Sequence, residues 1–190
     1  MHSYQRYSLA ALLLAVACLT TSCGGGSYSK RDFVAPEGMN KGLRVAVLPL
    51  ENLTNHHSAG IIVSQMLVTE LYKQNMFQLE EETAIRNWMT AEQIDINKIT
   101  DITYAQEVAR SLRVDAVLIG SVSEFGYQHG LHEESTVGFS IRLLRADDGK
   151  ILWAAGHATV GRGYIGRESV SETAQKVVER MVKTLVKKIK

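Results

Sequence analysis

The stretch from Val114 to Phe125 constrains the fold of this chain more than any other. Its first half, up to Gly120, is an almost unbroken apolar run, as in a strand that is covered on both faces. Its second half alternates polar and apolar side chains, as in a strand with one face in water. We therefore expect a central strand that begins under helices and runs on into an exposed edge of an antiparallel meander.

A hairpin follows this strand. Apolar residues alternate on both sides of an Asp148-Gly149 turn, a pattern that predicts two antiparallel strands. The apolar face consists of Val137, Phe139, Ile141, Leu143, Ile151, Trp153 and Ala155. The opposite face carries small residues, and we expect another backbone element to approach it closely. These small residues are Gly138, Ser140, Ala154, Gly156 and Ala158.

The other elements follow from periodicity and capping residues. A strand is expected over residues 43–50, a helix from Ser58 to about Gln74 that ends at Asn75, a short strand over 77–80, and helices over 84–91 and 103–112. The helix after Ser58 should bury a face that includes Ile61, Leu67 and Tyr72. From Ser169 onward, the spacing predicts an amphipathic helix of about 20 residues.

These elements predict one α/β domain over residues 42–190. It should be a single-domain sandwich, with a mixed sheet that ends in an antiparallel meander, helices packed on it and a long amphipathic C-terminal helix. A chain of 190 residues that is 45% hydrophobic fits one domain with a substantial core. Lys and Arg number 21 against 20 Asp and Glu, and this neutral balance argues against a nucleic-acid partner.

The N-terminus predicts an export signal. Met1–Ser22 combines Arg6, an apolar segment over residues 9–19 and small polar residues before Cys23, as in a signal peptide. The apolar segment is shorter than the roughly 20 residues of a transmembrane helix. The only cysteines are Cys18 and Cys23, so the remaining chain has neither a disulfide framework nor a thiol nucleophile.

The run from Leu19 to Gly24 resembles a bacterial lipoprotein lipobox, with Leu19 four residues before the cysteine where the usual pattern has three. The resemblance implies that the signal peptide is removed, that Cys23 carries lipid including palmitate, and that the protein reaches the periplasmic face of the outer membrane. Residues 23–41 are rich in glycine and polar residues and predict a flexible tether.

No set of residues predicts catalysis, so we do not expect an enzyme. Gly161–Gly166 formally matches G-x-G-x-x-G but follows an antiparallel hairpin rather than opening a βαβ unit, which favours a flexible connection. His129 and His132, with neighbouring glutamates, are weak metal candidates in a polar loop over residues 126–135. Their spacing fits no standard zinc site, so no cofactor is predicted. His157 is expected to be a hydrogen-bonded polar residue on a strand.

Four stretches together resemble one family: residues 45–54, 71–80, 109–122 and 142–153. They are similar to the periplasmic lipoprotein domain shared by the curli secretion channel protein CsgG, the peptidoglycan-synthase activator LpoB and the N-terminal domain of TolB. The resemblance implies a non-catalytic α/β domain that works by protein–protein contact. The secretion channel builds its barrel from two long hairpins, for which the 147–150 turn and the 126–135 loop leave no room, so this chain should not form a pore by itself.

The leading hypothesis is an accessory or assembly subunit of an envelope or secretion complex, anchored to the outer membrane by lipid. It predicts self-association into rings or co-purification with a membrane complex. Two alternatives remain open: activation of a peptidoglycan synthase, and binding of a small ligand or metal by the 126–135 loop. Ser121, Ser123 and Glu124, in the polar half of the central strand, are the candidate contact residues.

Overall fold

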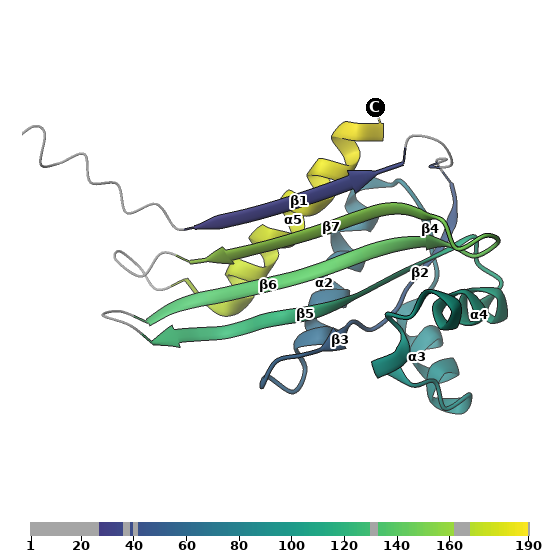
Figure 1. Cartoon of the computed structure of the whole chain (residues 1–190), viewed down its shortest axis with the longest axis horizontal. Coiled ribbons are helices and arrows are strands. Elements are labelled where there is room, and N and C mark those ends of the chain that lie inside the picture. Colours follow the sequence, from purple (N-terminus) through teal and green to yellow (C-terminus); the bar gives the residue numbers. More distant parts are fainter. Residues whose placement is uncertain (1–26, 36–38, 40–41, 130–132, 162–167, 190) are drawn as a thin grey trace, which may run out of the picture.

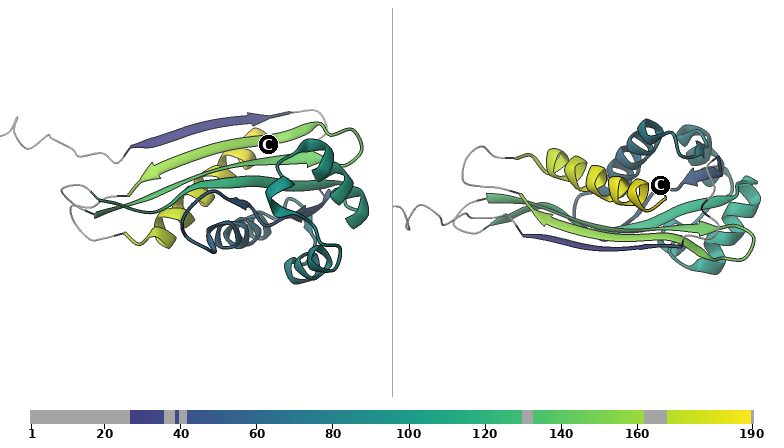
Figure 2. Two further views of the ribbon diagram at one scale, coloured as in Figure 1. Left: turned by 60° about the horizontal axis from the view of Figure 1, so that its bottom comes forward. Right: turned by 90° about the horizontal axis from the view of Figure 1, so that it is seen from above.

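The computed structural model describes residues 27–35, 39, 42–129, 133–161 and 168–189, and shows one mixed seven-stranded sheet with helices on both faces (Figures 1 and 2). The strands are β1 (Tyr28–Val34), β2 (Arg44–Val47), β3 (Glu51–Asn52), β4 (Gln78–Leu79), β5 (Ala116–His129), β6 (Glu133–Arg145) and β7 (Ile151–Val160). The helices are α2 (Ala59–Gln74), α3 (Glu82–Ala91), the 3-10 turn η1 (Ile96–Lys98), α4 (Ile102–Leu112) and α5 (Val170–Ile189).

Strand β5 lies in the interior of the sheet, whose order is β1-β7-β6-β5-β2-β4. It pairs in parallel with β2 and β3 up to Val122, and antiparallel with β6 along its whole length. Residues 116–120 are all buried, whereas beyond Val122 the one described strand that lies beside β5 is β6. This arrangement confirms the expected α/β class and the change in the strand from a covered centre to an exposed edge.

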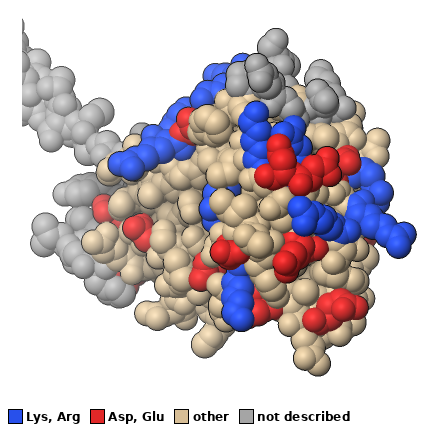
Figure 3. All heavy atoms as spheres, turned by 45° about the vertical axis from the view of Figure 1, so that its right-hand side comes forward, with Lys and Arg blue, Asp and Glu red and all other residues tan. Residues whose placement is uncertain are grey.

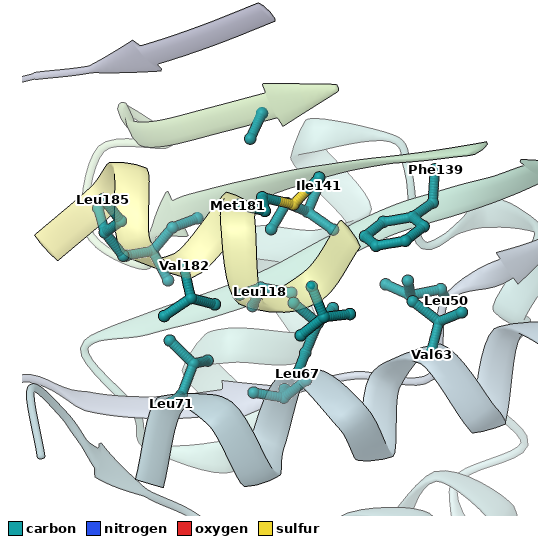
Figure 4. Close-up of a cluster of buried hydrophobic side chains, with 14 of the residues drawn as sticks. Leu50, Val63, Leu67, Leu71, Leu118, Phe139, Ile141, Met181, Val182 and Leu185 are labelled. Carbon is teal, nitrogen blue, oxygen red and sulfur yellow. The ribbon is translucent and has the colours of Figure 1, made fainter. Parts of the chain in front are cut away.

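Two hydrophobic clusters explain why the first half of β5 is apolar throughout. On the inner face of the sheet, Leu118 packs with residues of α2 and α5 such as Leu67 and Met181 (Figure 4). On the outer face, Val117 and Ile119 pack with residues of α3 and α4. Figure 2 shows α2 and α5 on one side of the sheet and α4 on the other. Alternate residues of one strand therefore enter different cores.

The buried face of α2 differs from the predicted one. Ile61 and Tyr72 are 38% and 54% exposed, whereas Leu67 is fully buried. The cause is a close approach at Gly60, where a Cβ atom would overlap the carbonyl oxygen of Leu50. This contact turns the Gly60 side of the helix toward the sheet and rotates Ile61 into water. Asn75 ends the helix in the left-handed conformation, as predicted.

The predicted tether over residues 23–41 is wrong for residues 28–34, which form the edge strand β1. The whole strand pairs antiparallel with β7, from Tyr28 opposite Thr159 to Val34 opposite Trp153. Its polar composition conceals a strand because one face and one edge are exposed to water, where charged residues are usual. The five steps from Cys23 to Tyr28 can span at most about 18 Å, at 3.3–3.6 Å per residue.

The predicted polar loop over residues 126–135 is also mostly strand. β5 and β6 continue their pairing as far as His129 opposite Glu133, so the two strands form one long hairpin. They extend beyond the helices, where side chains on both faces can be polar and no apolar alternation marks the strand. None of the described helices is both long and apolar enough to cross a membrane.

The close packing of β5 against β6 can be tested with two glycines of the same strand. A Cβ atom at Gly120 would overlap the carbonyl oxygen of Ser140, whereas a Cβ atom at Gly126 would have no atom within 4 Å. Gly120→Ala should therefore lower the free energy of unfolding by about 1–3 kcal/mol, and Gly126→Ala should not lower it. Urea unfolding of the domain from Gly24 onward measures both. Equal stability of the two variants would contradict the packing described.

Candidate interaction surface

Ser121, Ser123 and Glu124 lie together on the outer face of the sheet, beyond the end of the helices that cover it. A β-bulge produces this grouping: Val122 pairs with Phe139 and Glu124 with Gly138, which leaves Ser123 as the extra residue. Val122 and Phe125 consequently both face the inner core, and the two residues between them both face water. Without the bulge, strict alternation would direct Glu124 inward.

The surface around these residues is a small-residue floor, which means two rows of mostly small side chains that cross the strands. One cross-strand row consists of Arg31, Gly156, Ser140 and Ser121. The next consists of Ser29, Ala158, Gly138 and Glu124. The Ser123 hydroxyl donates a hydrogen bond to the Gly138 carbonyl at 3.2 Å, which fixes the bulge to its neighbour strand.

No described element covers this floor, although the small residues predicted a close backbone neighbour. The helix-bearing end of the outer face stops at Arg142, whose guanidinium donates to the Thr100 carbonyl at 2.6 Å. In Figure 3, which views this face obliquely, charged side chains gather over the helix-bearing end, and a largely uncharged area extends toward the other end. The close neighbour predicted for the small residues is therefore not supplied by the described part of the chain.

The first strand is attached to the domain by a buried polar cluster on the inner face. Asp32 Oδ1 lies 2.7 Å from His157 Nε2, and the Tyr28 hydroxyl lies 2.6 Å from His157 Nδ1. Because a carboxylate only accepts, Nε2 of a neutral imidazole donates to Asp32, and Nδ1 accepts from Tyr28. The prediction that His157 is a hydrogen-bonded residue within a strand is confirmed, and its side chain is fully buried.

Charges near this cluster are arranged to hold it together. Lys30 Nζ lies 3.4 Å from Asp32 Oδ2, which has no hydrogen bond in the described structure, so this contact is an ion pair without hydrogen-bond geometry. Burial raises the pKa of Tyr28, while the guanidinium of Arg180, 4.7 Å from the ring centre, acts in the opposite direction. The effect of the cluster is to fix β1 to β7 and α5.

Tyr28 and Asp32 did not emerge from the sequence as candidates, because their segment was assigned to the tether. The signal that could have identified them is the alternation of Tyr28, Asp32 and Val34 with exposed residues, which is the pattern of a half-buried strand. Among polar residues, this alternation is too weak to distinguish a strand from a linker without its neighbour β7.

The predicted metal candidates His129 and His132 fall largely outside what the structure describes, so they stay a prediction. His132 lies outside the described residues, as does Cys23, and only the backbone of His129 is described. The ring of His56, on the loop before α2, packs against Phe125 at 5.0 Å between centroids. Within residues 27–35, 39, 42–129, 133–161 and 168–189, no three His, Cys, Asp or Glu residues gather as a metal site.

No protein-family profile matches the chain, and a search of curated proteins gave no match. The fold is nevertheless similar to solved structures. The PelC dodecamer from Paraburkholderia phytofirmans shares 22% identity at a TM-score of 0.61, over 84% of this chain and 97% of PelC. Lipoprotein GNA1162 from Neisseria meningitidis shares 20% identity at a TM-score of 0.58, over 77% and 97% of the two chains.

The NMR structure of Escherichia coli LpoB is similar over 66% of this chain and 60% of LpoB, with 17% identity and a TM-score of 0.51. These low identities establish a shared fold. The resemblance to LpoB-type lipoprotein domains is therefore confirmed at the level of fold, and the resemblance to the curli channel protein and to TolB stays a prediction.

The bulge can be tested by deletion. Removing Ser123 should leave a regular ladder in which all remaining residues of β5 keep their present faces. Removing Ser121 should instead direct Val122 outward and Ser123 into the core. Because burial of one valine stabilises by about 1.5–3 kcal/mol, deletion of Ser121 should cost at least that much more than deletion of Ser123. Urea unfolding compares the two variants, and a more severe loss for the Ser123 deletion would refute the assigned register.

The buried cluster can be tested at Asp32. Asp32→Ala leaves the Nε2–H group of His157 buried without an acceptor, which should cost about 1–3 kcal/mol. Asp32→Asn keeps an acceptor and should recover part of the loss, and Ser29→Ala, on the exposed face of the same strand, should change stability by less than about 0.5 kcal/mol. Hydrogen exchange should show faster exchange of the β1 amides in Asp32→Ala. Unchanged protection of β1 would mean that the cluster does not hold the strand.

Proposed function

We propose that this protein is a lipid-anchored lipoprotein on the periplasmic face of the outer membrane. It acts without catalysis, as an accessory or assembly subunit of an envelope or secretion complex. The observation that carries the proposal is that β1 begins only five residues after Cys23 and is an integral strand of the sheet. The lipid on Cys23 therefore holds a rigid domain, with its bare sheet face, next to the membrane.

The shared fold supports the protein–protein part of the proposal. GNA1162 is a lipoprotein and PelC is a dodecamer, so this fold occurs both in a lipid-anchored protein and in a large homo-oligomer. In this chain, the small-residue floor and the outward-facing Glu124 offer a flat surface for a protein partner. Self-association of the anchored domain is therefore part of the proposed function.

The shared fold with LpoB also favours a second function, activation of a peptidoglycan synthase. The connection to the anchor argues against it. With Tyr28 in the sheet, the connection spans at most about 18 Å, which keeps the domain at the membrane. An activator of a synthase in the opposite membrane would need a longer reach. Addition of the soluble domain to a purified synthase tests this alternative, and an increased synthase rate would support it.

The anchor is tested at the two cysteines. In cells fed labelled palmitate, Cys23→Ser should abolish the label, leave the longer precursor and reduce the membrane-bound fraction, because the lipid site and the processing signal are both lost. Cys18→Ser lies in the segment that is removed and should retain label, processing and membrane binding. Persistent label in Cys23→Ser, or loss of label in Cys18→Ser, would show that the anchor site is wrongly assigned.

A further inference from the structure

The end of the sheet nearest the anchor is a four-stranded antiparallel unit with two free edges. β1 forms one edge, and residues 123–129 of β5 form the other, with β7 and β6 between them (Figure 1). No described strand lies beside either edge. Free edges are templates for another strand, and proteins normally cover or blunt them.

The backbone groups on the two edges are complementary. Ala35 donates to Leu152, and Val160 donates to Ser27, so the odd-numbered residues of β1 direct their backbone groups to β7. Even-numbered residues such as Lys30 consequently present theirs at the free edge. Backbone hydrogen bonds to one neighbour strand alternate along a strand. On β5 the outward-facing residues form those to β6, so the inward-facing residues Phe125 and Tyr127 present their backbone groups at the free edge.

Exposed hydrophobic side chains also lie along the two edges. Three of the most exposed large hydrophobic residues lie there: Phe33 on β1 is 54% exposed, Tyr127 on β5 is 48% exposed, and Leu53, next to Val122, is 60% exposed. On the outer face, each edge also carries one charge of opposite sign, Arg31 on β1 and Glu124 on β5. Both side chains are exposed, and neither has a hydrogen bond or ion pair with another described residue.

We propose that β1 of a second copy of this chain adds to the 123–129 edge of β5, head to tail, so that Arg31 of one copy lies opposite Glu124 of the next. This inference rests on the self-association in the proposed function and assigns its surface. In this register, Lys30 pairs with Phe125 and Tyr28 with Tyr127. Arg31 and Glu124 then form a non-hydrogen-bonded pair, with Cβ atoms about 4.5–5.5 Å apart, where opposite charges attract.

Strand direction and the anchor agree with this arrangement. β1 runs antiparallel to β7, β7 to β6 and β6 to β5, so β1 and β5 run in opposite directions. When two copies are related by rotation about an axis parallel to the strands, β1 of one copy therefore runs antiparallel to β5 of the next. Every N-terminus then lies at the same end, and every lipid can enter the same membrane. A head-to-tail contact of this kind closes into a ring when the rotation divides a full turn.

Contacts within one copy limit where the new pairing begins and how readily it forms. The Val122 carbonyl already accepts from the Leu53 amide, so pairing starts at Ser123. On β1, the Asp32 carbonyl accepts from Lys188 at 3.4 Å, a long bond from an exposed side chain that an incoming strand can displace. The other edge-facing groups of β1 have no backbone hydrogen bond to another described residue that would have to break.

The test uses disulfide trapping in the full-length, membrane-bound protein. Cys18 is removed with the signal peptide and Cys23 carries the lipid, so the body of the chain contains no other cysteine. The double variant Arg31→Cys/Glu124→Cys should form a ladder of covalent multimers under oxidation, because every copy then has one cysteine at each end of the contact. Each single variant should remain mainly monomeric.

The register control is Arg31→Cys/Gln128→Cys, which places the second cysteine on the same strand and face, four residues away. It should give at least fivefold less ladder. A ladder of equal strength in this control, a product that stops at dimers, or no covalent product would overturn the proposal. Palmitate label on the same samples separates the claim of a lipid anchor from the claim of this interface. A labelled protein that stays monomeric would contradict the interface alone. An unlabelled protein that forms the ladder would contradict the anchor alone.

Charge reversal provides a second measurement without cysteines. Glu124→Arg should reduce chemically crosslinked multimers about fivefold, because each contact then opposes two cations. Adding Arg31→Glu to it should restore them. Glu107→Arg, an exposed reversal on α4, is the matched control and should have no effect. Failure of the double reversal to restore multimers would show that the partner at this edge is not a second copy.

Discussion

Burial of the first half of β5 on both faces is the constraint on which the rest of the domain depends. The strand supplies Leu118 to the core under α2 and α5, and Val117 and Ile119 to the core under α3 and α4. Both helical layers pack against this one strand. The outer layer, α3 and α4, can therefore cover the sheet only as far as the apolar run of β5 extends. Where that run ends, after Gly120, no described element covers the outer face of the sheet. The candidate interaction surface is thus a direct consequence of the length of one hydrophobic segment.

Two local features turn this bare end into a specific surface. The bulge at Ser123 allows Val122 and Phe125 to face the same core, and it directs Glu124 outward at the same time. The buried hydrogen bonds of His157 to Tyr28 and Asp32 hold β1 in the sheet, although its sequence has little apolar content. Under the proposed anchor at Cys23, this polar cluster would also set how the domain is oriented on the membrane.

The strongly periodic elements were predictable because hydrophobic burial determines them locally. The hairpin of β6 and β7, the central strand and the left-handed end of α2 at Asn75 occur where the pattern predicts them. The predictions failed where a contact distant in sequence decides the outcome. The close approach of Gly60 to the Leu50 carbonyl decides which side of α2 faces the sheet. Pairing with β7 makes residues 28–34 a strand. The small-residue floor was recognised, but its expected neighbour is not among the described elements.

The sequence by itself determined the class of fold and the central position of residues 114–125, because apolar periodicity reports burial directly. It also determined the absence of cysteine from the chain after Cys23, and it predicts the anchor at that residue. The tertiary structure alone decided that residues 28–34 form a sheet edge, that Glu124 points outward, and that Arg31 and Glu124 occupy opposite free edges. These relations depend on strand register, which arises from pairing between strands, such as Tyr28 with Thr159, and leaves little trace in local composition.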